Sequence, residues 1–286
     1  MKIKSIVLAA IISTLILSAV FSQQQVVKND YRIEETIGKD SKGRDSRVIR
    51  FISPSGKVIK KVSNALNRQG YVYSVSPMAD YAIKIDEIEE KTNGAAKVRL
   101  TLIDANAKTA WVKTLDVDYV SKSEDEPMSY FLIISDDGDR IVFTRIRGYN
   151  DHPDSAYHEI IVYDTIGAEL ARVGHIPQIL DGYQISIAPD GKLVAATLHG
   201  GKLFFLDVKT GSYKICMSRG IIDGRKWSAS YDFTVQINDK KAIDKAVWIS
   251  AGIRGDWRKP NDKVPHWSGM ISFSDIPDDL STLFNK

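Results

Sequence analysis

The chain has only one cysteine in 286 residues, and this scarcity excludes several classes of protein. Cys216 has no second cysteine with which to form an internal disulfide, so the chain is not a small disulfide-stapled scaffold. No pairs of cysteine or histidine have the spacing of a zinc site. We interpret Cys216 as a buried and unreactive thiol.

The chain also lacks an excess of charge of one sign. It has 39 Lys and Arg residues against 36 Asp and Glu residues, and two of these cations, Lys2 and Lys4, lie at the N-terminus. Without them the balance is 37 against 36 (39 minus 2), a net charge of +1. Nucleic-acid-binding domains need a basic excess on one face. We therefore expect no nucleic-acid partner.

The common signatures of catalysis and cofactor binding are missing as well. The sequence contains no Gly-x-Ser-x-Gly elbow, no Walker phosphate loop and no Gly-x-Gly-x-x-Gly fingerprint. We therefore assign no catalytic residue and expect no cofactor.

The N-terminus, "MKIKSIVLAAIISTLILSAVFSQQQ", has the pattern of a secretory signal peptide. Two lysines precede an uncharged, mostly apolar run from Ser5 to Phe21, and the small residues Val20 and Ser22 come before Gln23. An uncleaved membrane anchor is the alternative, but this run is at the short end of the roughly 17 to 25 residues that span a bilayer. We expect a periplasmic or secreted protein of the bacterial envelope, which meets a membrane only if the signal stays uncleaved.

Removal of the predicted signal, residues 1–22, leaves 264 residues (286 minus 22). That length suits one repeat-built domain over residues 23–286, and it is ample to bury a core without disulfides. We expect this domain to be a monomer.

The chain contains an internal repeat. "ISIAPDGKLVAAT" from Ile185 matches "LIISDDGDRIVFT" from Leu132, 53 positions earlier, and "YVYSVSPMADYAIKI" is a third copy. In each copy alternating apolar residues lead through a Pro, Asp or Gly turn into a second apolar run, which predicts a β-hairpin. The matching positions Ser76, Ser135 and Ala188 are 59 and 53 residues apart.

A second hairpin pattern alternates with the first. It occurs four times, as "RVIRFISPSGKVIKKV", "VRLTLIDANAKTAWVKTL", "HEIIVYDTIGAELARV" and "KLFFLDVKTGSYKIC". Ser or Asp opens each turn, because a short polar side chain can bond to the backbone ahead, and Gly closes three of the four at positive φ. The second copy departs from the pattern with Ala107 at the closing position.

Four strands per interval is the size of one propeller blade with long loops. At these residues, and most closely at "IAPDGKLVAATLHGGKLFFLDVKTG", the chain resembles the WD40-like β-propellers, especially the extracytoplasmic repeats of the TolB kind. The resemblance covers roughly Arg47 to Cys216, although the Trp-Asp dipeptide of true WD40 blades is missing. It implies an all-β fold of about five four-stranded blades with a divergent C-terminal blade. Tandem β-sandwiches are the alternative.

The two ends of the repeat suggest how such a ring would close. The first unit, which begins at Tyr31, lacks an innermost strand, whereas the tail carries an additional strand-like run. Unpaired strand edges invite pairing with other chains. We therefore predict that Met270 to Phe273 pairs with strands of the Tyr31–Val62 region, and that "SDIPDDLSTLF" forms a short terminal helix.

One loop contains candidate metal ligands. "GYNDHPDSAYHE" places Asp151, His152, Asp154 and His158 close together in the sequence. Metal sites require a geometry that this spacing does not supply. The position between two strands of the third unit favours a solvated hairpin loop instead.

The C-terminal region contains a candidate ligand-binding patch. Four of the five tryptophans lie there, and "GIRGDWRKPNDKVPHW" interleaves rings with cations. Trp and Arg dominate binding hot spots, so we propose Arg254, Trp257, Arg258 and Trp267 as ligand-binding residues. The alternative is that these rings form the ordinary core of the last blade.

Two functional classes remain open. The first is an exported, non-catalytic β-propeller that binds a protein, peptide or glycan in the cell envelope. The alternative is an envelope hydrolase or lyase with its site at the central channel. Converging carboxylates and histidines would favour the enzyme, and an exposed aromatic patch would favour the binding protein.

Overall fold

The computed structural model describes residues 31–39, 45–65, 73–76, 81–90, 96–118, 130–148, 157–176, 185–222, 225–233, 244–253 and 266–285. The predicted signal peptide lies outside these ranges. So do three of the candidate metal ligands, Asp151, His152 and Asp154, and three of the candidate ligand-binding residues, Arg254, Trp257 and Arg258. No helix in the described ranges is long and apolar enough to cross a membrane.

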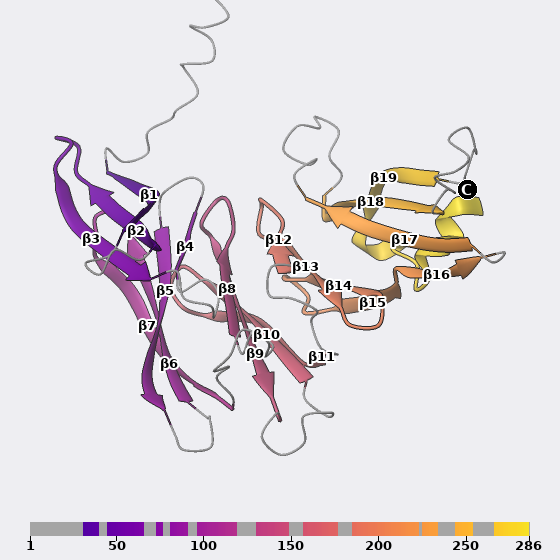
Figure 1. The fold of residues 1–286 in the computed structure, drawn as a ribbon, viewed down its shortest axis with the longest axis horizontal. Coiled ribbons are helices and arrows are strands. Elements are labelled where there is room, and N and C mark those ends of the chain that lie inside the picture. The colour runs from indigo at the N-terminus through magenta and orange to yellow at the C-terminus, as the bar shows by residue number, and fades with distance from the viewer. Residues whose placement is uncertain are drawn as a thin grey trace, which may run out of the picture.

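The described strands form five antiparallel sheets in chain order (Figure 1). Sheet 1 is β1 (Arg32–Lys39), β2 (Asp45–Ile52) and β3 (Val58–Ala65). Sheet 2 is β4 (Tyr73–Val75), β5 (Tyr81–Glu90), β6 (Ala96–Asp104) and β7 (Thr109–Val117). Sheet 3 is β8 (Tyr130–Ile134), β9 (Arg140–Arg147), β10 (Tyr157–Asp164) and β11 (Glu169–Ile176).

Sheet 4 is β12 (Ile185–Ile187), β13 (Leu193–Leu198), β14 (Lys202–Asp207) and β15 (Tyr213–Met217). Sheet 5 is β16 (Arg219–Ile222), β17 (Arg225–Asp232), β18 (Ala246–Ile253) and β19 (His266–Ser272). The predicted fold class is confirmed: the protein is nearly all β, with about five blades. Among the described residues sheet 1 has three strands and no innermost one, as predicted.

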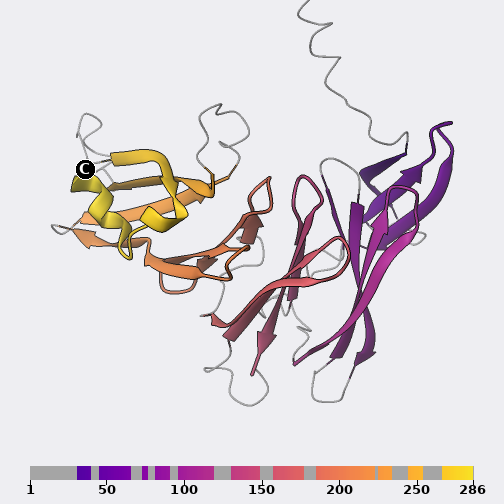
Figure 2. The same ribbon diagram turned by 180° about the vertical axis from the view of Figure 1, so that it is seen from behind.

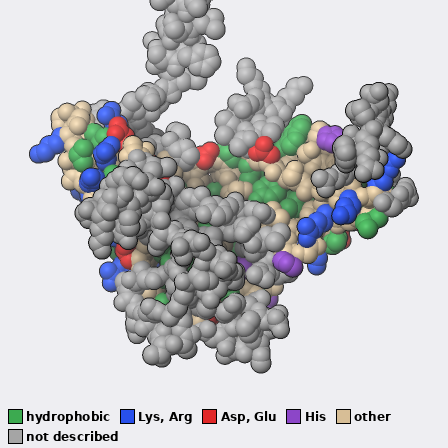
Figure 3. All heavy atoms as spheres, in the orientation of Figure 1, with side chains coloured by type: hydrophobic (Ala, Val, Ile, Leu, Met, Phe, Trp, Pro, Cys, Tyr) green, Lys and Arg blue, Asp and Glu red, His purple; other side chains and the backbone are tan. Residues whose placement is uncertain are grey.

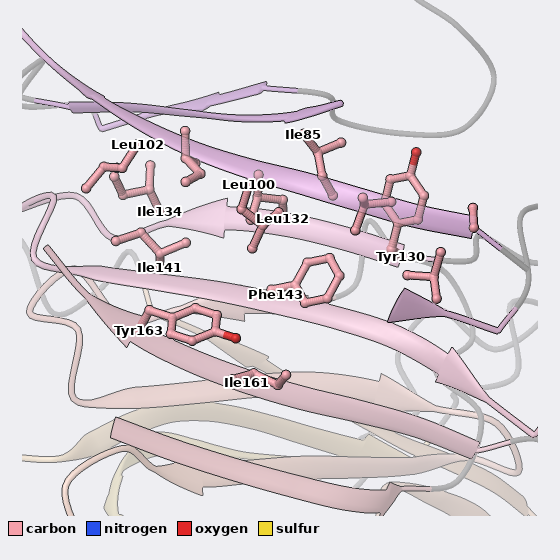
Figure 4. Packing of buried hydrophobic residues seen from close by; sticks show 14 residues of the cluster. Ile85, Leu100, Leu102, Tyr130, Leu132, Ile134, Ile141, Phe143, Ile161 and Tyr163 are labelled. Carbon is pink, nitrogen blue, oxygen red and sulfur yellow. The ribbon is translucent and has the colours of Figure 1, made fainter. Parts of the chain in front are cut away.

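The hydrophobic core consists of four layers, one between each pair of consecutive sheets. Sheets 2, 3 and 4 therefore bury both faces, which explains why β14 reads as the continuous apolar run Leu203–Leu206 and does not alternate. Figure 4 shows the layer between sheets 2 and 3, where Leu100 and Leu102 face Leu132, Phe143 and Ile161. This continuous stack differs from tandem sandwiches, in which each sheet would have one wet face.

The innermost strands β4, β8 and β12 lie next to one another, as the axis of a propeller requires. The Ser76 hydroxyl donates to the Asp136 carbonyl at 2.7 Å, which links sheet 2 to sheet 3. The Asp137 N–H donates to the Pro189 carbonyl at 3.4 Å, which links sheet 3 to sheet 4. The first hairpin turns of successive units are therefore stacked on one another.

The glycines of these turns occupy equivalent positions, as the repeat predicted. Gly138 has φ +77° and donates to the Ser135 carbonyl at 2.9 Å. Gly191 has φ +66° and donates to the Ala188 carbonyl at 2.8 Å. "SDDGD" is thus a hairpin turn between β8 and β9.

Ala107 keeps the conformation of the glycines that it replaces. It has φ +63°, and its N–H donates to the Asp104 carbonyl at 2.9 Å. Gly167 in sheet 3 has φ +82° and makes the matching bond to Asp164 at 3.1 Å. The left-handed region costs a residue with a Cβ about 1–2 kcal/mol. The pairing of the two flanking strands therefore determines the conformation of the turn, and Ala107 adopts the strained backbone conformation that this pairing requires.

Sheet 5 joins the stack differently from the other sheets. β15, the outermost strand of sheet 4, leads into β16 through Ser218 alone. The backbone N–H of Ser218 donates to the Gly201 carbonyl at 2.9 Å, and the Ser218 carbonyl accepts from the Ala229 N–H at 2.6 Å. The backbone of Ser218 is therefore bonded to both sheets. In the earlier units a longer connection returns the chain to the innermost strand. The C-terminal blade is divergent because the chain enters it from the outer edge.

The last residues cover the end of the stack. In place of the single predicted terminal helix, the tail forms two short 3₁₀ segments, η3 (Phe273–Asp275) and η4 (Leu280–Asn285). The Met217 N–H on β15 donates to the Asp278 carbonyl at 2.8 Å. Ile276, Leu280 and Leu283 are buried in the layer between sheets 4 and 5. The tail thus covers an edge of sheet 4 and completes the last core layer.

The prediction that Met270 to Phe273 closes the ring is wrong. β19 pairs with β18, where Ile271 lies opposite Val247. Among the described residues, β1, β2 and β3 pair only with one another, and β19 forms an edge of sheet 5. Figures 1 and 2 show sheets 1 and 5 at opposite ends of the molecule. The tail turns inward after β19 to cover the last core layer, so it does not reach the first sheet.

Candidate functional site

A pocket of about 400 Å³ opens where the turns of sheets 3, 4 and 5 meet. We call it the rim pocket. Its wall includes the start of β9, the turn between β12 and β13, the turn after β14 and the residues before β18. Because successive units place equivalent turns at the same end of the stack, residues far apart in the sequence converge here.

In the part of the chain that the structure describes, four cations and one carboxylate line the rim pocket. The cations are Arg140, Lys192, Lys209 and Lys245, and the carboxylate is that of Asp244. Such an excess of one charge in a concave surface attracts ligands of the opposite charge. The lining therefore favours an anionic group.

Two of the cations are held in ion pairs. Lys192 Nζ bonds to the Asp244 carboxylate and lies 3.3 Å from Asp190 Oδ2. Lys245 Nζ lies 2.7 Å from Oδ2 of the buried Asp207. Burial on its own would raise the pKa of Asp207, but the hydrogen bonds from Lys245 and neighbouring groups hold this pKa below its ordinary value. These pairs connect sheet 4 to the start of β18 and neutralise half of the cations.

Arg140 and Lys209 differ from the other two cations. Arg140 Nη1 donates to the Asp139 carbonyl at 2.8 Å. Within the described ranges neither Arg140 nor Lys209 forms a salt bridge with a carboxylate of this chain. Their charges are available to a ligand.

The rest of the lining is apolar or backbone. Leu170 is 38% exposed, and the buried Val208 also borders the pocket. Gly191 contributes backbone, and the stem of Arg140 lies so close that a Cβ added to Gly191 would be 2.4 Å from the Arg140 Cγ. The pocket thus combines cations with apolar side chains, as ligand sites commonly combine polar and apolar groups.

Sequence analysis did not identify the rim pocket. The sequence carried only a basic residue close behind the turn glycine in two copies of the repeat: Arg140 follows Gly138 by two residues in "DDGDR", and Lys192 follows Gly191 by one residue in "PDGK". These two cations occupy different positions of the repeat, and they meet on one surface only because the turns that carry them are stacked. On the face shown in Figure 3, Lys and Arg side chains lie at both ends of the described surface and do not form one field.

Comparisons with known proteins give fold-level similarity alone. No protein-family model and no curated protein matches the chain. Among solved structures it is similar to KlHsv2 with loop 6CD replaced by a Gly-Ser linker, with 11% identity, 84% of this chain and 83% of that chain covered, and a TM-score of 0.36.

It is also similar to the WD40 domain from Toxoplasma gondii coronin, with 9% identity, 79% of this chain and 53% of that chain covered, and a TM-score of 0.39. The tricorn protease is similar with 11% identity, 85% of this chain and 30% of that chain covered, and a TM-score of 0.37. The chain thus spans about half of the coronin chain and less than a third of the tricorn chain. The assignment of the fold rests on the strand order and stacked cores of this protein.

His158, a candidate metal ligand, lies inside the protein on β10. It pairs with Ile146 on β9 and Ile176 on β11, and only 6% of its surface is exposed. Burial lowers the pKa of His158 to about 4, so the ring is neutral at pH 7. The described residues contain no group of three potential metal ligands. The metal hypothesis, whose other three residues lie outside the described ranges, stays a prediction.

We expect His158 to make the protein sensitive to acid. In the unfolded chain the pKa of histidine is about 6.5, above the folded value of about 4. As pH falls through this window the unfolded state binds a proton that the folded state excludes. The contribution of His158 to the free energy of unfolding is therefore complete above about pH 6.5, and about 3 kcal/mol of it is lost by pH 4.

Urea denaturation at pH 7 and pH 4 measures this loss. His158→Gln should reduce the difference between the two pH values, whereas His199→Gln, at an exposed histidine, should leave it unchanged. An equal pH dependence in the wild type and His158→Gln would refute the assignment.

The neighbouring residue, Glu159, belongs to a cluster of charges between sheets 2 and 3. Its carboxylate accepts from Arg145 Nε at 2.6 Å and from Arg172 Nη1 at 2.9 Å. Arg145 Nη1 also donates to the Asp116 carbonyl on β7. Burial alone would raise the pKa of Glu159, but the two guanidinium groups outweigh it and hold this pKa below its ordinary value. We infer that this cluster holds sheets 2 and 3 together.

Trp267 is the one member of the predicted ligand-binding patch that lies in the described residues. It is partly buried and packs against the core layer between sheets 4 and 5. Its ring also lies beside Gly269, where an added Cβ would be 3.3 Å from Cζ2. The patch as a whole stays a prediction.

Cys216 is buried, as expected, with 1% of its surface exposed. Burial, with a smaller effect of Asp278, raises the pKa of its thiol to about 12. The reactive thiolate form is therefore disfavoured at neutral pH.

Proposed function

We propose that the protein is an exported, non-catalytic propeller of the TolB-like kind, which binds a protein, peptide or glycan in the cell envelope. Its rim pocket holds an anionic group of that ligand. The observation that carries this proposal is the lining of four cations against one carboxylate at the junction of three sheets. A rigid stack that presents such a pocket on its turns suits recognition, because the turns are held by the core beneath them.

Export is supported by the charged start, the apolar run from Ser5 to Phe21 and the small residues before Gln23. N-terminal sequencing of protein recovered from the envelope or medium tests it. A chain that begins at Gln23 would support export, and an intact Met1 would contradict removal of the signal.

Anion binding is tested by titrating the purified protein with three probes in a calorimeter. The probes are a short acidic peptide with a free carboxyl terminus, a hexuronate oligosaccharide and a lysine-rich peptide with an amidated carboxyl terminus. At least one of the two anionic probes should bind, with an affinity that falls as salt is added, and the lysine-rich peptide should not. Absence of binding by both anionic probes would contradict the proposal.

A matched pair of variants locates the site. Lys209→Glu reverses a charge in the rim pocket, in the turn between β14 and β15. Lys108→Glu makes the same change at an exposed lysine in the equivalent turn of sheet 2, outside the pocket. Lys209→Glu should weaken anion binding about tenfold, and Lys108→Glu should have little effect. Equal effects would show that binding occurs elsewhere.

A further inference from the structure

We infer that the rim pocket recognises the carboxyl terminus of a peptide whose last residue is apolar. This inference rests on the proposed function, since it identifies the anionic ligand of the same site. It is carried by the chemistry of the lining, by the state of Arg140 and by the volume of the pocket.

Arg140 is placed to bind a carboxylate. A guanidinium has five N–H donors in a planar fork that matches the two oxygens of a carboxylate, and one of these donors is occupied by the Asp139 carbonyl. The stem of Arg140 lies against the backbone at Gly191, which limits its rotation. A side chain that is already positioned loses little conformational entropy when a ligand binds.

The remaining charges favour a ligand of low charge. Lys192 and Lys245 are neutralised by Asp244 and Asp207. Lys209 supplies one further cation to the lining. A single carboxylate would therefore complement these two cations, whereas a second anionic group on the ligand would add repulsion from the carboxylate of Asp244 in the same lining.

The uncharged part of the lining distinguishes a peptide from a glycan. Leu170 and Val208 offer an apolar surface to a side chain. Among the described residues, no hydroxyl, amide or aromatic side chain belongs to the lining. A sugar ring would therefore find few neutral groups to pair with its hydroxyls and no aromatic ring on which to stack. Unpaired polar groups cost affinity on desolvation.

The volume favours a chain end over an internal acidic residue. About 400 Å³ is near the lower limit of ligand pockets, which suits one or two residues. At a C-terminus the carboxylate and the last side chain diverge from one carbon, so both reach their partners together. An internal Asp or Glu would bring backbone on both sides, with N–H and C=O groups that need hydrogen bonds of their own.

Fluorescence polarisation with labelled pentapeptides tests the inference on the full chain. The probe is Gly-Ser-Gly-Ser-Leu with a free carboxyl terminus. The comparisons are the same peptide as its C-terminal amide, and an amidated version with Asp at the third position. The free acid should bind at least tenfold more tightly than either amide, because each lacks the terminal carboxylate.

Variants of Arg140 separate fork recognition from simple charge. Arg140→Gln should weaken binding of the free acid tenfold or more, and Arg140→Lys, which keeps the charge, should recover only part of it. Arg99→Gln is the matched control, because Arg99 is an exposed arginine on β6, outside the pocket. Thermal melting of each variant tests whether it is folded. Lys209→Gln, at an exposed side chain, should reduce binding of the free acid independently of Arg140.

The outcomes separate this inference from the proposed function. If the amidated Asp peptide or a hexuronate oligosaccharide binds as tightly as the free acid, the carboxyl-terminal inference is overturned and anion binding stands. If neither the peptides nor the hexuronate binds, both fail. Selective binding of the free acid that Arg140→Gln abolishes and Arg99→Gln preserves supports the inference.

Discussion

A chain that ends at Asp275 is expected to lose more than about 6 kcal/mol of folding stability. The deletion removes Ile276, Leu280 and Leu283, whose side chains are at most 2% exposed in the layer between sheets 4 and 5. Removing one large buried aliphatic side chain costs about 2–5 kcal/mol. The sum is comparable with the whole stability of a typical domain, about 5–15 kcal/mol.

The deletion also uncovers polar backbone. The Met217 N–H loses its bond to the Asp278 carbonyl, and the edge of sheet 4 becomes available for pairing with another chain. We therefore expect aggregation as well as instability. Urea denaturation and size-exclusion chromatography measure the two effects.

Two point variants calibrate this experiment. Leu280→Ala removes one buried side chain from the same layer and should cost about 3 kcal/mol. Ser281→Ala changes its neighbour, which is less buried, and should be nearly neutral. A truncated chain that keeps the wild-type melting temperature and stays monomeric would show that the C-terminal segment does not complete the core.

Gly191→Val is expected to destabilise the protein by about 4 kcal/mol. Gly191 has φ +66°, which is unfavourable for a β-branched residue by about 2 kcal/mol. The new Cβ would also lie 2.4 Å from the Arg140 Cγ and 3.2 Å from its Cβ. Relief of such an overlap costs about 1–3 kcal/mol in addition.

Gly211→Val isolates the backbone contribution. Gly211 has φ +71° in the turn between β14 and β15, and a Cβ added there meets nothing within 4 Å. This control should lose about 2 kcal/mol. If the two variants lose equal stability in urea denaturation, the contact between Gly191 and Arg140 does not constrain the turn.

Much of the fold was predictable because it depends on neighbouring residues. Turns such as Ser135–Gly138 and Ala188–Gly191 are closed by bonds within a few residues and by glycine at positive φ. The strands on either side have enough apolar character to be recognised without a partner. Repetition of these local signals was enough to predict about five blades and the missing innermost strand of the first.

The strands of sheet 5 were harder to predict. β17 occupies Arg225–Asp232, and Phe233 follows it as a buried side chain of the last core layer. β16 was not predicted, since Arg219–Ile222 is short and exposed and has little periodicity. These strands are specified by pairing with β18 and by packing on sheet 4, which are tertiary interactions.

The rim pocket likewise depends on local sequence for its residues and on tertiary structure for their arrangement. Each of its cations has a local explanation as a polar turn residue, and nothing near Arg140 in the sequence indicates that Lys209 or Lys245 lies on the same surface. Their convergence requires sheets 3, 4 and 5 to stack with their turns aligned. Charge patterning along a chain does not report distances between its blades.

The sequence by itself determined the all-β class, the hairpin turns, the approximate number of blades and the burial of Cys216, because these depend on local backbone preference and apolar periodicity. The tertiary structure alone decided how the stack ends and where charged turns meet. Ring closure failed as a prediction because the energy gained by burying Leu280 and Leu283 directs the tail inward, and no local sequence signal records that competition.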